Sequence, residues 1–230
     1  MQYHKSFKKF IESSDYFKDM ESFINNTPNI CPIKENVFRF MLCNLSNIKY
    51  VILGMDPYPS TYEDNGVIKP VATGRAFEVA NIDRWTDKYK QISLSNIFKA
   101  LCYYRFNKKY SMEELRILAN NGNIDFINTH QWFDAMEDRG VMFLNASLTT
   151  IFGKSGSHIG IWNNFMNELI NYIIKNADCF WLIWGNIALE RVKDIVDYNR
   201  IIYSCHPASR TNNDFIENNC FIKANKICWF

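Results

Sequence analysis

The sequence predicts an α/β protein, a three-layer α/β/α sandwich around a central, mainly parallel four-stranded sheet. Apolar runs typical of buried strands occur near residues 48–54, 141–144, 179–184 and 200–204, and segments with helical spacing separate them. Strands that alternate with helices in this way form parallel sheets with helices on both faces. The 230 residues show no repeat, linker or low-complexity tract, so we expect one domain, residues 1–230.

The N-terminal part is predicted to be helical. In residues 3–26, phenylalanines and charged residues alternate at roughly helical spacing, which is typical of one or two amphipathic helices. Thr27-Pro28 and Cys31-Pro32 interrupt them, because proline is poorly tolerated inside a helix. A further helix is expected over residues 34–46. Residues 1–47 should therefore form a helical extension that packs on the domain.

The middle of the chain is expected to be irregular at first. Residues 55–90 are rich in Pro, Gly, Asp and Asn, which predicts a loop with a short strand near 75–79. A helix is expected over 93–104, where Ser93-Leu94-Ser95-Asn96 supplies cap residues. Further along, Ser111-Met112-Glu113-Glu114 has the form of a capping box, which marks another helix start.

The C-terminal half continues the alternation of strands and helices. Helices are predicted over residues 161–176 and 186–196, between the last three strands, and a final helix from about residue 213. A helix between two buried strands provides the crossover that a parallel pair requires.

Composition excludes several classes of protein. Hydrophobic residues make up 47% of the chain, so it is not a disordered polymer. Seven cysteines without a Cys-x-x-Cys pair predict reduced thiols in an intracellular protein, with no metal and no other cofactor. The chain has no signal peptide and no apolar run of 18 residues, which predicts a soluble intracellular protein, cytoplasmic or nuclear. The net charge of +2 is only weak support for nucleic-acid binding.

Polar side chains follow three of the predicted strands at the points where the strands end. The run 51–54 stops in a loop that holds Asp56 between a glycine and two prolines. Asn145 ends the strand near 141–144, and His206 follows the strand near 200–204. Because ligands of open α/β sheets bind at the carboxyl ends of the strands, these side chains form a candidate site.

The three strand ends together resemble uracil-DNA glycosylase, family one. Its water-activating loop reads Gly-Gln-Asp-Pro-Tyr-His, its base-reading strand ends in Leu-Leu-Asn, and its DNA-inserting loop begins His-Pro-Ser. The corresponding segments here are Gly54-Met55-Asp56-Pro57-Tyr58-Pro59, Phe143-Leu144-Asn145 and His206-Pro207-Ala208. Further matches, which extend the resemblance over about residues 48–228, are Gly74-Arg75-Ala76-Phe77, Ser157-His158 with Trp162, 180–186 and 219–225.

The resemblance implies a monofunctional enzyme that flips uracil out of DNA and hydrolyses its N-glycosidic bond. Asp56 would orient the attacking water and stabilise the sugar cation, and His206 would donate to uracil O2 as a neutral imidazole. The Asn145 amide would pair with O4 and N3–H of uracil and reject cytosine. Phe77 would stack on the base, and the Tyr58 ring would exclude the methyl group of thymine.

Residues around these positions are expected to contact DNA containing uracil, single- or double-stranded. Met55 stands where most of the family has glutamine and should border the base. Arg210 stands where the family usually carries an apolar wedge, and its guanidinium could stack on bases and reach a phosphate. The predicted DNA contacts are Pro59, Ser93, Ser157, His158, Pro207, Ala208, Ser209, Arg210 and Thr211.

Several alternatives stay open. Pro59, Ala208 and Arg210 resemble the poxviral branch of the family, which couples excision to viral DNA replication, so a replication-protein partner is a hypothesis. A glycosylase with another base specificity is conceivable because Met55 and the long 62–73 loop border the site. A catalytically weak DNA-binding or replication-scaffold protein of the same fold is a second alternative. A nucleotide-binding domain is disfavoured because neither Gly-x-Gly-x-x-Gly nor a P-loop is present.

Overall fold

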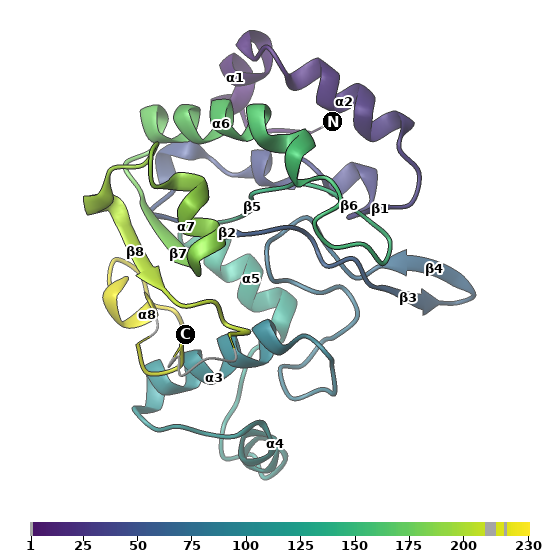
Figure 1. The fold of residues 1–230 in the computed structure, drawn as a ribbon. Helices are drawn as coiled ribbons and strands as arrows, with labels where there is room; N and C mark the ends of the chain where they lie inside the picture. The colour runs from purple at the N-terminus through teal and green to yellow at the C-terminus, as the bar shows by residue number, and fades with distance from the viewer. Residues whose placement is uncertain (1, 210–214, 219) are drawn as a thin grey trace.

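A four-stranded parallel sheet forms the centre of the computed structural model, which describes residues 2–209, 215–218 and 220–230. The strand order is β5-β2-β7-β8, so the first of these strands in the sequence lies inside the sheet (Figure 1). All three pairings are parallel, and the predicted fold class is confirmed. The strands are β2 (Tyr50–Gly54), β5 (Val141–Asn145), β7 (Phe180–Trp184) and β8 (Ile201–Ser204).

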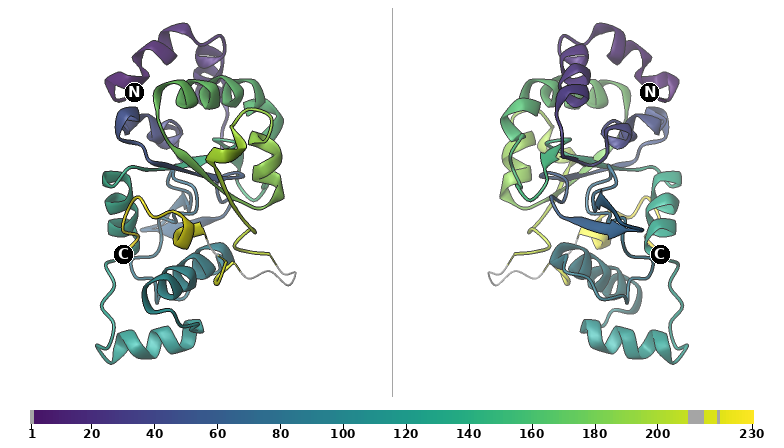
Figure 2. Two further views of the ribbon diagram at one scale, coloured as in Figure 1. Left: turned by 90° about the vertical axis from the view of Figure 1, so that its left-hand side faces the viewer. Right: turned by 90° about the vertical axis from the view of Figure 1, so that its right-hand side faces the viewer.

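Helices cover both faces of the sheet and complete the three layers (Figures 1 and 2). Alternate residues of β2 point to opposite faces: Val51 and Leu53 pack into one core cluster, and Tyr50 and Ile52 into the other. The first face carries α1 (Lys8–Ser13), α2 (Phe17–Asn26), α6 (Ile159–Asn176) and α7 (Asn186–Val192). The second carries α3 (Ile92–Phe106), α5 (Thr129–Asp138) and α8 (Cys220–Lys223).

The N-terminal part of the chain contacts α6, and only part of it is α-helical. The short turn η1 (Lys5–Phe7), α1 and α2 confirm the helical reading of residues 3–26. The helix expected over 34–46 was wrong, because Val37, Phe38, Phe40 and Met41 are all buried, and a surface helix cannot turn nearly consecutive side chains inward. Three separate 3-10 turns take its place: η2 (Lys34–Asn36), η3 (Arg39–Leu42) and η4 (Leu45–Asn47).

A β-hairpin interrupts the predicted loop over residues 55–90. It consists of β3 (Thr61–Asp64) and β4 (Val67–Pro70) and projects from the body of the molecule (Figure 1). Asn65 and Gly66 connect the strands with φ of +51° and +79°, the left-handed pair that the tight turns of hairpins require. The Asn65-Gly66 dipeptide is by itself a sequence signal for such a hairpin.

The short strand expected near 75–79 is reduced to one bridge between Ala72 and Val79. Phe77 prevents a longer strand, because its φ of +68° is incompatible with extended pairing. A two-stranded pair outside the main sheet, β1 (Ile30–Cys31) with β6 (Thr150–Ile151), ties the N-terminal part to the loop after β5.

Of the helix starts predicted from cap residues, one is correct and one is wrong. The capping box at α4 (Met112–Asn120) is confirmed, since Ser111 and Glu114 cap each other's backbone. Ser93 does not cap α3, because the helix starts at Ile92 and Ser93 is buried inside its first turn. The last helix begins at Cys220 instead of near residue 213, and residues 215–218 form a turn. Within the described ranges, no helix has the length and apolarity needed to cross a membrane.

Candidate active site

The carboxyl ends of the four parallel strands surround a cavity of about 310 Å³. This edge of the sheet is where open α/β proteins bind their ligands, because the loops that leave the strands diverge there. The volume lies at the lower end of the range of small-molecule sites. The predicted site residues that line it are Met55, Asp56, Tyr58, Pro59, Phe77, Ser93, Asn145 and His206.

Asp56 is held from the loop that follows β6. The Gly156 N–H donates to Asp56 Oδ2 at 2.6 Å, and Ser155 Oγ donates to the same oxygen at 2.9 Å. Among the described residues, Oδ1 receives only the longer contact from Ser155, at 3.2 Å. A carboxylate oxygen can accept more than one hydrogen bond, so Oδ1 keeps capacity for a water molecule.

Asn145 and Gly54 are paired neighbours at the ends of β5 and β2. The Asn145 side chain is buried and lies across Gly54 so closely that a Cβ built on the glycine would stand 2.4 Å from Asn145 Oδ1. Only glycine allows this approach. Within the described residues the amide forms no side-chain hydrogen bond, so a ligand can take its donor and its acceptor.

Phe77 forms an aromatic wall of the cavity. Its ring lies 4.9 Å from that of Trp184, tilted by 49°, and 6.4 Å from the His206 imidazole. The left-handed backbone at Phe77 is uncommon for a bulky residue, and such conformations concentrate at ligand sites. Arg75, two residues before Phe77, also lines the cavity and is buried in ion pairs.

Tyr58 is locked into the cavity wall. Within the described part of the chain its hydroxyl is buried and has no hydrogen-bond partner of normal geometry. Burial raises the pKa of the Tyr58 phenol well above its ordinary value, and the neighbouring Ser93 hydroxyl acts against this shift. The ring is therefore neutral and rigid, and Ser93 lies inside the protein against it instead of on the surface.

His206 is a half-buried, neutral imidazole. Burial lowers the pKa of His206 below its ordinary 6.5. Its Nδ1 accepts the Ala208 N–H at 3.1 Å, so the proton of the neutral ring is on Nε2. Gly185, with φ of +95°, makes room for it, since a Cβ there would stand 2.9 Å from His206 Cβ. The tautomer leaves Nε2–H as a donor.

The other predicted DNA-contacting residues divide into two groups. Ser157 is exposed, and its Oγ accepts the Ile151 N–H at 2.8 Å in a surface turn. His158 is 4% exposed and bonded to Thr149 Oγ1, so it faces the core and the predicted DNA contact is wrong for this side chain. The loop residues Pro207, Ala208 and Ser209 follow His206 directly, whereas Arg210 and Thr211 lie outside the described residues.

The sequence assigned no site role to five lining residues outside the Asp56 loop: Arg75, Ser155, Trp184, Ile187 and Ala188. Ser155 lay two positions from a motif residue but carried no signal of its own. Trp184 was read only as the end of a strand, and Ile187 and Ala188 only as helix. Trp184, Ile187 and Ala188 line the cavity because β7 leads directly into α7 at its edge.

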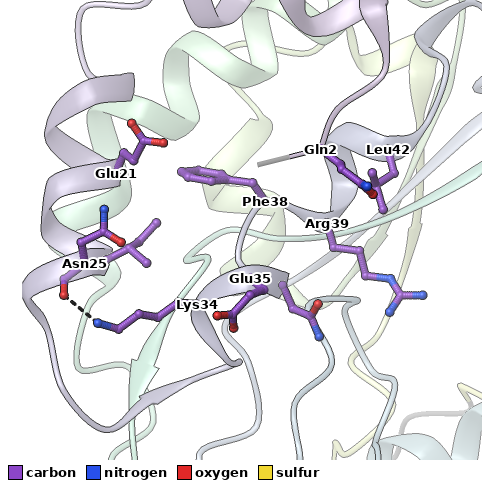
Figure 3. Close-up of a pocket in the computed structure, with 10 residues that line it drawn as sticks. Gln2, Glu21, Asn25, Lys34, Glu35, Phe38, Arg39 and Leu42 are labelled. Atoms are coloured by element: carbon purple, nitrogen blue, oxygen red, sulfur yellow. Dashed lines mark hydrogen bonds between the residues drawn. The ribbon is translucent and has the colours of Figure 1, made fainter.

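A larger cavity, of about 610 Å³, lies away from the strand ends between α2 and the turns η2 and η3 (Figure 3). Its lining mixes both charge signs, with Glu21 and Glu35 against Lys34 and Arg39, and contains none of the motif residues. Among the described residues, no three His, Cys, Asp or Glu side chains are grouped as a metal site.

The fold and the strand-end cavity define a class of protein. A small pocket with aromatic walls and one unpaired amide suits a planar heterocycle that is read by its edge, as enzymes that act on flipped bases do. The carboxylate beside it suits a hydrolase that attacks the bond between such a base and its sugar.

Comparisons with known proteins agree with this class. The chain is 31% identical to the uracil-DNA glycosylase of Mycoplasmopsis pulmonis, over 97% of this chain and 90% of that protein. The match to the uracil-DNA glycosylase of Francisella tularensis subsp. holarctica is also 31% identical and covers 86% and 78%. No protein-family model matches the chain.

Solved structures show the same fold. A mimivirus UNG, solved in complex with UGI, superposes with a TM-score of 0.67 at 27% identity and covers 90% of this chain and 70% of its own. The UNG of Nitratifractor salsuginis superposes with a TM-score of 0.69 at 17% identity, over 91% and 86%, which shows the fold alone. The chain belongs to the uracil-DNA glycosylase family.

Proposed function

We propose that the residues around the strand-end cavity excise uracil from DNA in base excision repair and leave an abasic site. Family membership makes the chain a uracil-DNA glycosylase, and the convergence of Asp56, Phe77, Asn145 and His206 on one cavity is the observation that carries the residue roles. Hydrolysis of the N-glycosidic bond develops positive charge on the deoxyribose and negative charge on the departing base. Asp56 faces the first charge, and His206 faces the second.

The catalytic roles follow from the hydrogen bonds at each residue. Asp56 accepts two bonds at Oδ2 and offers Oδ1 to the attacking water, and its negative charge stabilises the sugar cation. His206 offers Nε2–H to uracil O2 while its Nδ1 is engaged by the Ala208 N–H. A neutral donor stabilises the anionic base without a proton from solvent, and the burial that lowers the pKa of His206 keeps it in that form.

Base selection rests on three side chains. The Asn145 amide pairs with O4 and N3–H of uracil, and cytosine, which presents the opposite donor and acceptor, would leave buried groups unpaired. The rigid Tyr58 ring blocks the C5 methyl group of thymine, and Met55 borders the base. No residue of the β3–β4 hairpin lines the cavity, which argues against the alternative in which the 62–73 loop changes the base specificity.

We propose that the loop 207–209, Pro59 and the exposed Ser157 contact the DNA strand on either side of the flipped nucleotide. Pro59 lines the cavity, residues 207–209 follow the lining residue His206 directly, and Ser157 lies on the turn whose Gly156 bonds Asp56. The proposal extends to Arg210 and Thr211 on sequence grounds alone. Uracil-containing DNA is the substrate of the family, and we therefore propose that the chain works inside the cell. We also propose that it acts as one domain and that a replication protein is its partner.

A catalytically weak scaffold protein is the second candidate, and one experiment separates the two. Oligonucleotides that carry a single uracil, thymine or cytosine are incubated with the protein, and abasic sites are cleaved with alkali. We expect cleavage only at uracil, in chelator as well as in buffer, for single and double strands. DNA binding without cleavage would favour the scaffold, and cleavage at another base would favour the altered specificity.

A further inference from the structure

Phe77, to which the proposed function assigns base stacking, has a backbone conformation that needs support. Its φ of +68° lies in the left-handed region, where a Cβ crowds the neighbouring carbonyl group. Residues persist there only when the surrounding structure holds them. The ring is also only half-buried, because one side faces the open cavity, so its own packing against Trp184 is limited to one face.

An ion pair closes the chain behind Phe77. Arg75 Nη1 lies 3.0 Å from Glu78 Oε1, and the two side chains are only 4% and 2% exposed. Thr73 Oγ1 donates to the other carboxylate oxygen of Glu78 at 2.5 Å. Arg75 and Glu78 stand on either side of Ala76 and Phe77. Their contact therefore closes residues 75–78 into a small loop, from which the phenyl group projects.

The closed loop of residues 75–78 contacts helix α5. Arg75 Nη2 contacts Asp134 at 2.6 Å and Glu137 at 2.5 Å, and His130 Nδ1 lies 3.1 Å from Glu78 Oε1. Helix α5 in turn packs on β5, the strand that ends in Asn145. The stacking ring and the base-reading amide are therefore fixed to the same rigid layer.

Arg75 and Glu78 are almost fully buried, and taking two charges out of water is costly. Buried ion pairs recover their desolvation cost only with good geometry and satisfied partners, and apolar residues often stabilise a core as well or better. The Arg75–Glu78 contact itself links the two ends of the segment that bears Phe77. We propose that this pair positions Phe77 for the base: it sets the angle of the stacking ring and thereby the affinity of the cavity for uracil, an inference that rests on the proposed function.

The variant Glu78→Gln tests the proposal, because it removes the charge and keeps the shape. We expect the inhibition constant of free uracil and KM for uracil-containing DNA to rise together, by about tenfold. The value of kcat should stay within about twofold, since Asp56 and His206 are untouched, and binding of abasic DNA should not change. The matched control is Asp178→Asn, which removes the carboxylate that Arg200 contacts at 2.6 Å and does not line the cavity, and it should change neither constant by more than about twofold.

A double-mutant cycle separates positioning from general damage. In a Phe77→Leu background, Glu78→Gln should add nothing, because the ring that it positions is gone. A folded Glu78→Gln protein with normal uracil inhibition, or equal losses with and without Phe77, would overturn the proposal. If Glu78→Gln does not fold, Thr73→Val takes its place, because it removes the donor to Glu78 together with the acceptor of the Arg75 N–H at 3.3 Å. It should shift both constants a few-fold in the same direction, and no shift would be equally decisive against the proposal. A wild-type protein that releases no uracil would refute the proposed function instead.

Discussion

Gly54→Ala is the most direct steric test of the base-reading site. The new Cβ would stand 2.4 Å from Asn145 Oδ1 and 3.1 Å from Ala76 Cβ. Contacts with a Cβ below about 3.0 Å do not occur, so the amide must retreat by roughly 0.6 Å or more, or turn away from the base. Gly54 has no positive φ, so the backbone itself accepts alanine, and the strain falls mainly on the amide and to a smaller degree on Ala76.

The magnitude follows from how strongly this chemistry depends on position. A displacement of about 1 Å in a positioning group costs on the order of 100-fold in rate, or about 2.7 kcal/mol of transition-state stabilisation. Stability should change little, because loss of unfolded-state entropy contributes about 0.4–1 kcal/mol in favour of alanine and the clash offsets it. We therefore expect kcat/KM on uracil-containing single strands to fall by about 100-fold in a protein that melts near the wild-type temperature.

Gly160→Ala is the matched control for this variant. Gly160 lies in helix α6, and a Cβ there meets nothing within 4 Å. The control should keep full activity and gain about 0.5–1 kcal/mol, because alanine is the better helix former. Wild-type kcat/KM in a folded Gly54→Ala protein would show that Asn145 does not read the base from this position.

Three further predictions concern the cavity. Asp56→Asn should lower kcat by about 1000-fold with abasic-DNA binding nearly intact, because water orientation and cation stabilisation are lost while surface contacts stay; near-normal turnover would make Asp56 structural. Asn145→Asp should release cytosine and Tyr58→Ala should release thymine, each measured on oligonucleotides with one such base, and folded variants that gain neither activity would contradict the assigned roles. The acid side of the pH profile of kcat/KM should be centred below 6.5, the ordinary pKa of histidine, because burial lowers the pKa of His206. Activity should fall there because protonation at Nδ1 breaks the hydrogen bond from the Ala208 N–H. A decline centred above 6.5 would assign this part of the profile to another group.

Local patterns along the chain determined the sheet and most of the helices. The run Tyr50–Gly54 is apolar throughout because both of its faces are covered, and such a run is recognisable without tertiary information. The capping box of Ser111 and Glu114 is equally local, since both partners lie within one turn. The β3–β4 hairpin is local as well, since the Asn65-Gly66 dipeptide alone specifies its turn. The helix expected over 34–46 failed because apolar content there reflects burial on all sides and not helical periodicity.

The motif residues could be named from the sequence, but only the tertiary structure brought them their partners. Ser155 and Gly156 bond Asp56 from the loop that follows β6, about 100 positions further along the chain. No sequence pattern near Asp56 predicts these partners. The burial of Arg75 among carboxylates of α5 was likewise invisible, because an arginine in a polar loop reads as solvated. Periodicity and caps depend on neighbours in sequence and can be read from it. The partners of a buried charge depend on how distant loops are packed, which only the folded core decides.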